Sequence, residues 1–154
     1  MTISTSALQQ KNAKHLIQSF SDLSYINNPQ ETHIISRADG VYIYDNDGKK
    51  ILDSMSGLWC VNMGYGQQSI IKAVNEQMKE LVYYNNFFGS SHPSAIKLSE
   101  MIADITPEGM NKVYFCGSGS EANDTVVRLT RHYWAARGKP SKYVIISRTN
   151  AYHG

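Results

Sequence analysis

The sequence has no apolar run long enough to cross a lipid bilayer, which takes roughly 20 consecutive apolar residues. Its longest apolar runs are only a handful of residues. The N-terminal segment is rich in Ser, Gln and Lys and lacks the apolar block that precedes cleavage in a secretory signal. We therefore expect a cytoplasmic protein that neither crosses a membrane nor is secreted.

Cysteine is scarce, and the charges nearly cancel. The two cysteines, Cys60 and Cys116, lie far apart and form neither a CxxC pair nor a disulfide framework. We interpret both as small buried apolar residues, not as nucleophiles. The 15 Lys and Arg residues exceed the 13 Asp and Glu residues by only two, without a basic cluster of the kind that contacts nucleic acid. We expect no metal site and no nucleic-acid partner.

Aromatic residues are well represented. The 154 residues include ten Tyr, four Phe and two Trp, and 42% of the chain is hydrophobic, which is enough for a core. Several aromatic residues lie beside Gly, Ser or Asn outside any apolar period. That placement favours a lined pocket over a packed core.

The first part of the chain contains short apolar runs and strong turn residues. Residues 6–19 predict a mostly polar helix, which we interpret as an N-terminal arm. Short runs at 34–35, 41–44 and 50–53 predict strands. The Asp-Asn-Asp-Gly turn at 45–48 favours a hairpin, because these residue types tolerate positive φ. The sequence thus predicts an antiparallel meander.

Two aromatic segments without a hydrophobic period follow, at 56–66 and 83–89, and we expect both to be loops. Two amphipathic helices alternate with them. One covers about residues 68–82, and the other opens at Pro93, where the missing N–H of proline costs nothing. Their apolar faces are expected to be buried.

The last part of the chain predicts a parallel βαβ unit, which indicates an α/β fold. A strand at 112–116 is followed by a glycine turn and a helix that Gly138 closes. The continuous apolar run 143–146 is typical of a strand buried on both faces. Since two parallel strands cannot bury both faces of a covered sheet, we expect a truncated chain; a complete small domain is the alternative.

The segment Gly117–Ala122 lies where the expected strand ends and the helix begins. Its glycines, its serines and the helix N-terminus favour an anion cradle suited to a phosphate. Ser120 also suits the N-cap position, so a capped turn without a ligand remains open. The same letters fit the looser dinucleotide fingerprint, with Arg148 where an acidic residue is usual, so an NAD(P)-dependent oxidoreductase also remains open.

The remaining candidates are aromatic residues in loops. Tyr152 and His153 follow the second expected strand at its carboxyl end, where parallel sheets bind ligands, and a ring there could stack on a flat cofactor. Both could equally be ordinary surface residues. Two further pairs are pocket candidates, with a core or subunit interface as the alternative: Leu58 and Trp59, and Phe87 and Phe88.

Taken together, these segments resemble the N-terminal portion of a class III pyridoxal-phosphate-dependent aminotransferase, of the omega type that uses amines or β-alanine with pyruvate. The resemblance runs from about Asp22 to the last residue. It is strongest at SGLWCVNMGYG (56–66), NFF (86–88) with His92-Pro93, GSGSEAND (117–124) and YHG (152–154).

The resemblance implies a fold of the fold-type-I transferases, in which a homodimer forms its active site at the subunit interface. Residues 1–64 would be an arm and meander of the small domain. Residues 65–154 would begin the large domain, which binds pyridoxal 5′-phosphate (PLP).

Site residues follow from the same resemblance. Ser118, Gly119 and Ser120 would hold the PLP phosphate, Tyr152 would stack on its pyridine ring, and His153 would lie beside the ring. Other residues would shape the substrate pocket: Leu58 and Trp59 as its wall, Phe87 or Phe88 reaching the partner subunit, and Phe20 in a similar role.

The implied activity is amino transfer from an amine or omega-amino acid to a keto acid such as pyruvate. The family more often has Asn at the position of Gly117, so one side-chain contact would be lost. Its Schiff-base lysine lies beyond Gly154, so the chain would hold no catalytic residue and would be inactive alone. A non-catalytic binding or assembly module is the remaining alternative.

Overall fold

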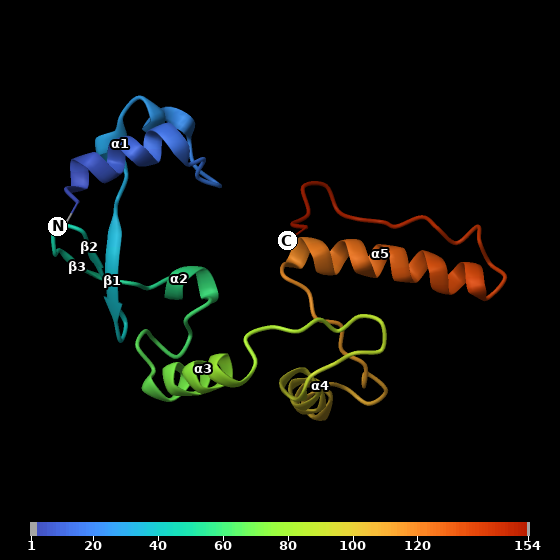
Figure 1. Ribbon diagram of the computed structural model, residues 1–154. Helices are drawn as coiled ribbons and strands as arrows, with labels where there is room; N and C mark the ends of the chain where they lie inside the picture. Colours follow the sequence, from blue (N-terminus) through green and yellow to red (C-terminus); the bar gives the residue numbers. More distant parts are fainter. Residues whose placement is uncertain (1–2, 154) are drawn as a thin grey trace. The chain divides into compact units, whose positions relative to one another are not determined.

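The computed structural model describes residues 3–153, apart from the side chain of Tyr25, and divides into two compact units, Met1–Tyr83 and Tyr84–Gly154. Figure 1 shows the elements of each unit, which are described separately below. Among the described residues, no helix combines the length and the apolar character that a membrane span requires.

A three-stranded antiparallel sheet, in the order β1-β2-β3, organises the first unit. Its strands are β1 (Ile35–Asp39), β2 (Tyr42–Asp45) and β3 (Lys50–Leu52). The predicted meander is thus confirmed, as is its hairpin turn at 45–48. Gly48 has a φ of 89°, and an Asp45 carboxylate oxygen accepts the backbone N–H groups of Asp47 and Lys49.

Helix α1 (Thr5–His15) is the polar arm expected from the sequence. The Gln9 side-chain amide donates to the backbone carbonyls of Gln30 and Thr32, at 3.1 and 2.9 Å. At the N-terminal end of the helix, the Thr5 hydroxyl donates to the Asp47 carboxylate in the hairpin turn. Polar contacts, not a buried apolar face, therefore attach the arm. Two 3₁₀ turns, η1 (Leu23–Ile26) and η2 (Pro29–Glu31), link it to the sheet.

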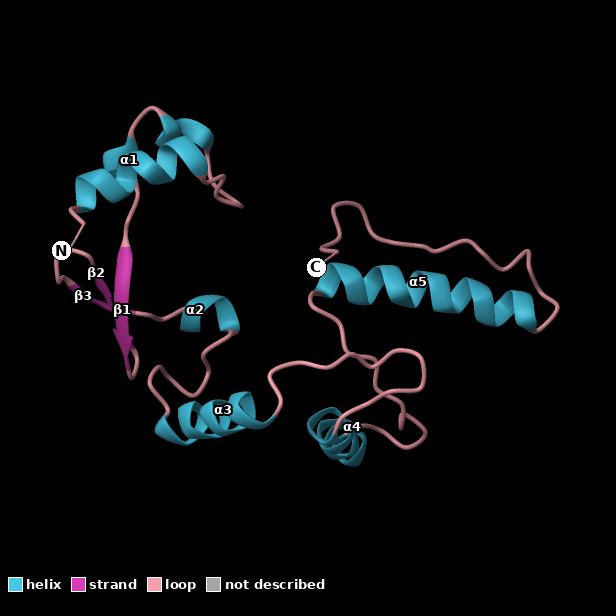
Figure 2. Ribbon diagram, viewed as in Figure 1, coloured by secondary structure: helices cyan, strands magenta, loops and turns pink. Residues whose placement is uncertain are grey.

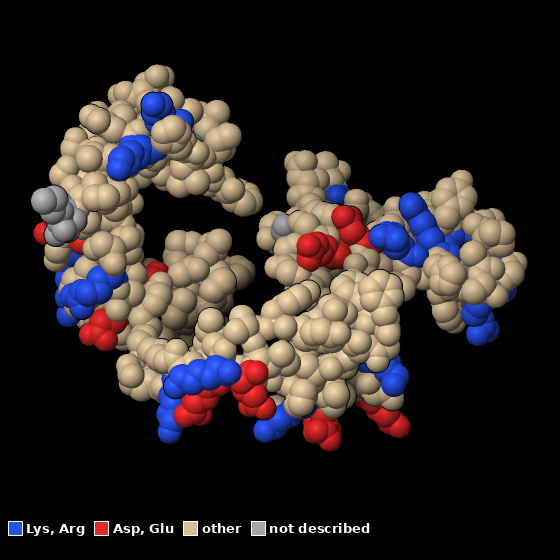
Figure 3. All heavy atoms as spheres, viewed as in Figure 1, with Lys and Arg blue, Asp and Glu red and all other residues tan. Residues whose placement is uncertain are grey.

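The predicted loop at 56–66 contains one helical turn, α2 (Ser56–Trp59), before α3 (Gln68–Glu80) begins. Residue 65 is attached to the sheet, since the backbone groups of Tyr65 and Gly40 bond to each other at 2.7 and 3.3 Å. Acidic and basic side chains are interspersed in the region of α3 in Figure 3, where Lys72 and Glu76 pair at 3.9 Å.

The second unit contains α4 (Pro93–Ile105) and α5 (Gly119–Ala136), both in accordance with the sequence. His92 caps α4, because its Nδ1 accepts the Ala95 N–H at 3.4 Å. At the other end of α5, Gly138 has a φ of 72° and donates to the Ala135 carbonyl, as expected of a glycine that closes a helix.

After α5 the chain turns and runs back along the helix, as Figures 1 and 2 show. We call residues 143–153 the return segment. The Arg131 guanidinium donates to the Tyr143 carbonyl at 2.9 Å near the start of this segment, and the Asn123 amide donates to the His153 carbonyl near its end. The return segment therefore brings residues 152–153 back to the N-terminal end of α5.

The predicted strands at 112–116 and 143–146 are wrong for this structure, in which both stretches lack regular secondary structure (Figure 2). A strand requires ladder hydrogen bonds to a neighbour, and neither stretch has a neighbouring strand among the described residues. The predicted burial of 143–146 on both faces is also wrong, since Ile146 is 92% exposed.

The apolar faces of the helices form at the predicted spacing, but they are not buried as expected. Thr32 is the only polar residue buried among the described residues, and the predicted burial of Cys60 and Cys116 is wrong, since both are exposed. The residues that share the apolar face of α3 are all about half exposed: Ile70, Ile71, Val74 and Met78. The elements therefore owe their definition here to local hydrogen bonds and caps, not to a filled core.

Candidate functional site

The N-terminus of α5 is built by a serine cap. Ser118 lies in extended conformation, and its hydroxyl accepts the Glu121 N–H at 3.2 Å. The N-cap is thus Ser118, and the expectation that Ser120 caps the helix is wrong. Gly119 and Ser120 lie in the first turn of α5, where the helix dipole is positive.

The turn before α5 already binds an anionic oxygen. A Glu121 carboxylate oxygen accepts the Gly117 N–H at 2.6 Å, which with the Ser118 cap makes a variant of the capping box. A Cβ at Gly117 would lie 3.1 Å from the same oxygen. Glycine at 117 thus leaves space for this carboxylate. The donor set of the turn therefore fits a phosphate group.

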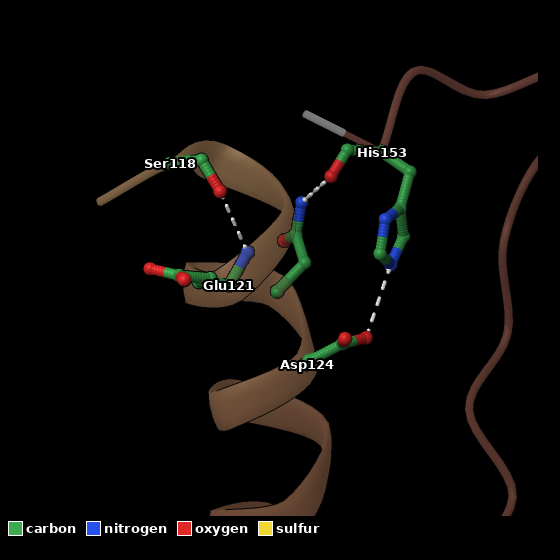
Figure 4. Close-up of polar contacts among 5 residues, drawn as sticks. Ser118, Glu121, Asp124 and His153 are labelled. Carbon is green, nitrogen blue, oxygen red and sulfur yellow. Dashed lines mark hydrogen bonds and ion pairs between the residues drawn. The ribbon is translucent and has the colours of Figure 1, made fainter. Parts of the chain in front are cut away.

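The return segment places His153 against the first turns of α5 (Figure 4). The Asn123 side-chain amide donates to the His153 carbonyl, and His153 Nε2 lies 3.7 Å from an Asp124 carboxylate oxygen. The structure thus brings together two of the segments that the sequence singled out, the glycine turn and the Tyr-His pair. Tyr152 precedes His153 with 85% of its surface exposed, so its ring is available to a ligand.

Leu58 and Trp59, which the sequence suggested as pocket residues, lie in the first unit in a turn of unfavourable backbone conformation. All four residues of α2 have positive φ: 49° at Ser56, 59° at Gly57, 67° at Leu58 and 65° at Trp59. This is a left-handed turn, which costs roughly 1–2 kcal/mol for each residue with a Cβ. Leu58 and Trp59 are 67% and 82% exposed, so their packing within this unit does not offset the cost.

Asp53 supports this turn. One of its carboxylate oxygens accepts the Gly57 N–H at 2.7 Å and the Tyr65 hydroxyl at 2.8 Å, and the other accepts the Met55 N–H at 3.2 Å. The hydrogen bond from Tyr65, followed by the backbone N–H groups, lowers the pKa of Asp53 against the opposing effect of partial burial. The same hydrogen bond, with desolvation and the Asp53 charge, raises the pKa of Tyr65.

Phe87 and Phe88 lie in the second unit, with ring centroids 6.1 Å apart. Phe88 is fully exposed and has a φ of 56°. Within residues 84–153, no ring contact joins either of them to Tyr152. Phe20, in the first unit, is likewise fully exposed with a φ of 53°. Strain of this kind in bulky residues points to functional positions.

Sequence reasoning missed the polar residues that hold the site together. The Ser118-x-x-Glu121 spacing of a capping box could have identified Glu121. An aspartate in a turn commonly accepts the backbone N–H two residues on, as in an Asx turn, and Asp53 could have been identified in this way. Asn123 gave no signal, because its partner His153 lies 30 residues away.

The chain matches the class III aminotransferase family over residues 25–154. It is 54% identical over 140 residues to a putrescine–pyruvate aminotransferase from Pseudomonas aeruginosa, which covers 91% of this chain and 30% of that protein. The chain thus spans about a third or less of the length of the relatives it matches.

Solved structures agree with this match. An (S)-enantioselective omega-transaminase from Thermomicrobium roseum is 32% identical, with a TM-score of 0.91 over 100% of this chain and 34% of that one. The omega transaminase from Pseudomonas jessenii in complex with PMP is 38% identical, with a TM-score of 0.89 over 96% of this chain and 32% of that one. The expected transferase fold is therefore confirmed, and the chain belongs to the class III aminotransferase family.

Proposed function

We propose that the full-length protein is a PLP-dependent transaminase that moves an amino group from an amine or omega-amino acid to pyruvate or a related keto acid. The observation that carries this proposal is the convergence of the glycine turn at α5 with Tyr152 and His153. The glycine turn suits a phosphate group, and the exposed ring of Tyr152 suits a flat ring. The putrescine–pyruvate specificity of the Pseudomonas aeruginosa relative supports an amine and pyruvate as substrates.

The phosphate of PLP would bind at the N-terminus of α5. Ser118, Gly119 and Ser120 would hold it in the first turn of the helix, where the helix dipole favours negative charge. The PMP complex of the Pseudomonas jessenii relative supports this choice of cofactor.

The ring of the cofactor would lie against Tyr152. When bound, PLP supplies an electron sink that stabilises the carbanion formed as the substrate loses a proton. This chain's part would be to bind and orient: the exposed phenol ring of Tyr152 would stack on the pyridine, and Asn123 fixes the backbone of His153 by its hydrogen bond. Tyr152 would thereby orient the ring and exclude water from the face that it covers.

The substrate wall and the subunit interface complete the proposal. Leu58 and Trp59 would bound the substrate pocket, and Phe87 or Phe88 would reach the active site of a second subunit in a homodimer. The domain division at residues 64 and 65 belongs to the same proposal. The comparisons give no support to the oxidoreductase alternative, which rested on the glycine turn alone.

Titration of the full-length protein with PLP and with NADPH tests the proposal. We expect a visible absorbance change and saturation with PLP, no saturation with NADPH, and formation of alanine from pyruvate when putrescine is the donor. Saturation with NADPH and no response to PLP would favour the oxidoreductase. Binding of neither ligand would favour a non-catalytic module.

A further inference from the structure

The left-handed turn Ser56–Trp59 needs an external support. Four successive residues with positive φ are unfavourable for an L-residue chain, and only Gly57 adopts the conformation without cost. Leu58 and Trp59 project into solvent within this unit, so no packing of their own side chains holds them. The direction of both side chains therefore depends on the contacts that fix the backbone of the turn.

The Asp53 carboxylate makes those contacts at the entrance of the turn. Its two oxygens accept the N–H groups of Met55 and Gly57, and its backbone carbonyl accepts the Ser56 N–H at 3.3 Å. Three consecutive residues are thus bonded to one aspartate. Since the carboxylate is charged, these hydrogen bonds are of the stronger kind.

Tyr65 connects this aspartate to the sheet. Its hydroxyl donates to the same Asp53 oxygen that accepts the Gly57 N–H, and its backbone pairs with Gly40 at the end of β1. The phenol oxygen also packs closely against the turn, because a Cβ built at Gly57 would lie 2.9 Å from it. Glycine is thus favoured at position 57 for two reasons, its positive φ and the closeness of the Tyr65 phenol oxygen.

We propose that Asp53 and Tyr65 are positioning residues that hold the left-handed turn and so set the size and shape of amine that the wall formed by Leu58 and Trp59 accepts. This inference rests on the proposed function, because it assigns a specificity role to a turn whose substrate contact is itself proposed. Asp53 and Tyr65 touch neither substrate nor cofactor in this role. They act through the backbone of residues 55–59.

The test uses the full-length enzyme with PLP bound. Tyr65→Phe removes one hydroxyl, and Asp53→Asn removes the charge at nearly constant size. Tyr42→Phe, in β2 of the same sheet, is the matched control, because Phe keeps the ring that packs against the Lys50 ammonium. Each protein is examined by amide hydrogen exchange of the 54–62 peptide and by kcat/KM for putrescine and for 1-phenylethylamine.

We expect Tyr65→Phe to raise exchange in the 54–62 peptide by about fivefold and to change the ratio of the two kcat/KM values by a similar factor. Asp53→Asn should have a larger effect in the same direction, and Tyr42→Phe none. PLP affinity, measured by absorbance, should be the same in all four proteins. Unchanged exchange and an unchanged ratio in Tyr65→Phe would overturn the proposal, even if Asp53→Asn fails to fold.

Gly57→Ala provides an independent arm. Its Cβ would meet the Tyr65 hydroxyl, so the cost of Gly57→Ala in exchange and in amine preference should be smaller when Tyr65→Phe is already present. Additive effects would contradict a direct coupling through the phenol oxygen.

If the wild-type enzyme transfers no amino group, the proposed function is wrong, and so is the role of Asp53 and Tyr65 in specificity. The exchange measurements would still show separately whether Asp53 and Tyr65 hold the turn.

Discussion

At the scale of single residues, several bulky side chains in each unit adopt left-handed conformations. Phe20, Leu58, Trp59 and Phe88 all have positive φ, and all four are largely exposed. Glycine would adopt such a φ at no cost. The presence of bulky residues in place of glycine therefore indicates that their side chains are needed at these positions. A pocket wall and a subunit contact, as proposed above, would need them.

Trp59→Gly tests this interpretation. The change relieves a positive φ of 65° and removes a side chain that is 82% exposed, so the free energy of unfolding should stay constant or rise by up to about 1 kcal/mol. In the full-length enzyme the open wall should raise kcat/KM for 1-phenylethylamine relative to putrescine. Denaturant unfolding and steady-state kinetics measure the two effects.

Trp134→Gly is the control for this substitution. Trp134 lies inside α5, where glycine costs about 1 kcal/mol, and its ring packs against the Lys142 ammonium at 3.9 Å. This variant should lose stability without a change in amine preference. A loss of stability in Trp59→Gly as large as in Trp134→Gly would show that the left-handed turn is not strained.

Ser118→Ala separates the structural role of a helix cap from its role in binding. Loss of the N-cap should cost about 1 kcal/mol of stability, and the affinity for PLP should fall because a hydroxyl near the phosphate is gone. Ser4→Ala removes the corresponding cap of α1 and should lower stability alone. Equal PLP affinities in the two variants would contradict a phosphate at α5.

At the scale of elements, what the sequence predicted well was local. Helical periodicity and caps identified α3, α4 and α5, and the Asp-Asn-Asp-Gly turn identified the β2–β3 hairpin. The strands at 112–116 and 143–146 were wrong, since a strand depends on partners that a single segment does not specify. The bond from Asn123 to His153 could not be predicted, because it joins residues 30 apart across an irregular segment.

The Asp53–Tyr65 hydrogen bond should stabilise the first unit over a defined pH window. The pKa of Asp53 is lowered, so its contribution is complete above about pH 4 and is lost as the pH falls through the lower folded-state value. The pKa of Tyr65 is raised, so its contribution is complete below about pH 10 and is lost as the pH rises further.

The difference in unfolding free energy between the wild type and Tyr65→Phe measures this window. It should be constant between about pH 5 and 9 and should shrink on either side. In the Asp53→Asn background, Tyr65→Phe should show no acid dependence. A difference that persists unchanged at about pH 2 would contradict a hydrogen bond to an ionised carboxylate.

The end of the return segment offers a comparison between two contacts. Asn123→Ala removes the hydrogen bond to the His153 carbonyl and should raise amide exchange over residues 150–153 and weaken PLP binding. Asp124→Asn removes only a pair at 3.7 Å whose side chains are 62% and 75% exposed, which contributes little in water. The effect of Asp124→Asn on exchange and on PLP binding should be much smaller than that of Asn123→Ala. A larger effect of Asp124→Asn would show that the ion pair holds His153.

At the scale of the whole molecule, the chain is about 30% of the length of its Pseudomonas aeruginosa relative, and the apolar faces of its helices are exposed. The match over residues 25–154 shows the family of this chain. The homodimer and the substrates are proposals for the full-length protein.

Phe88→Gly tests the proposed homodimer in the full-length protein. The ring is fully exposed within its unit and its φ is 56°, so glycine should not destabilise the subunit. Loss of a central aromatic contact should weaken the dimer about tenfold or more. Sedimentation over a dilution series measures the dimer constant, and an unchanged constant with a lower melting temperature would place Phe88 in a core instead.

The return segment also has a consequence for the order of folding. The hydrogen bond from Asn123 to His153 closes a loop of only 30 residues. It brings the Tyr-His pair at the end of this loop next to the glycine turn at its start. Closing a loop of this length costs little more entropy than closing one half as long. The contact that brings the Tyr-His pair to the glycine turn is thus short-range, so its formation during synthesis requires no residue outside 117–153.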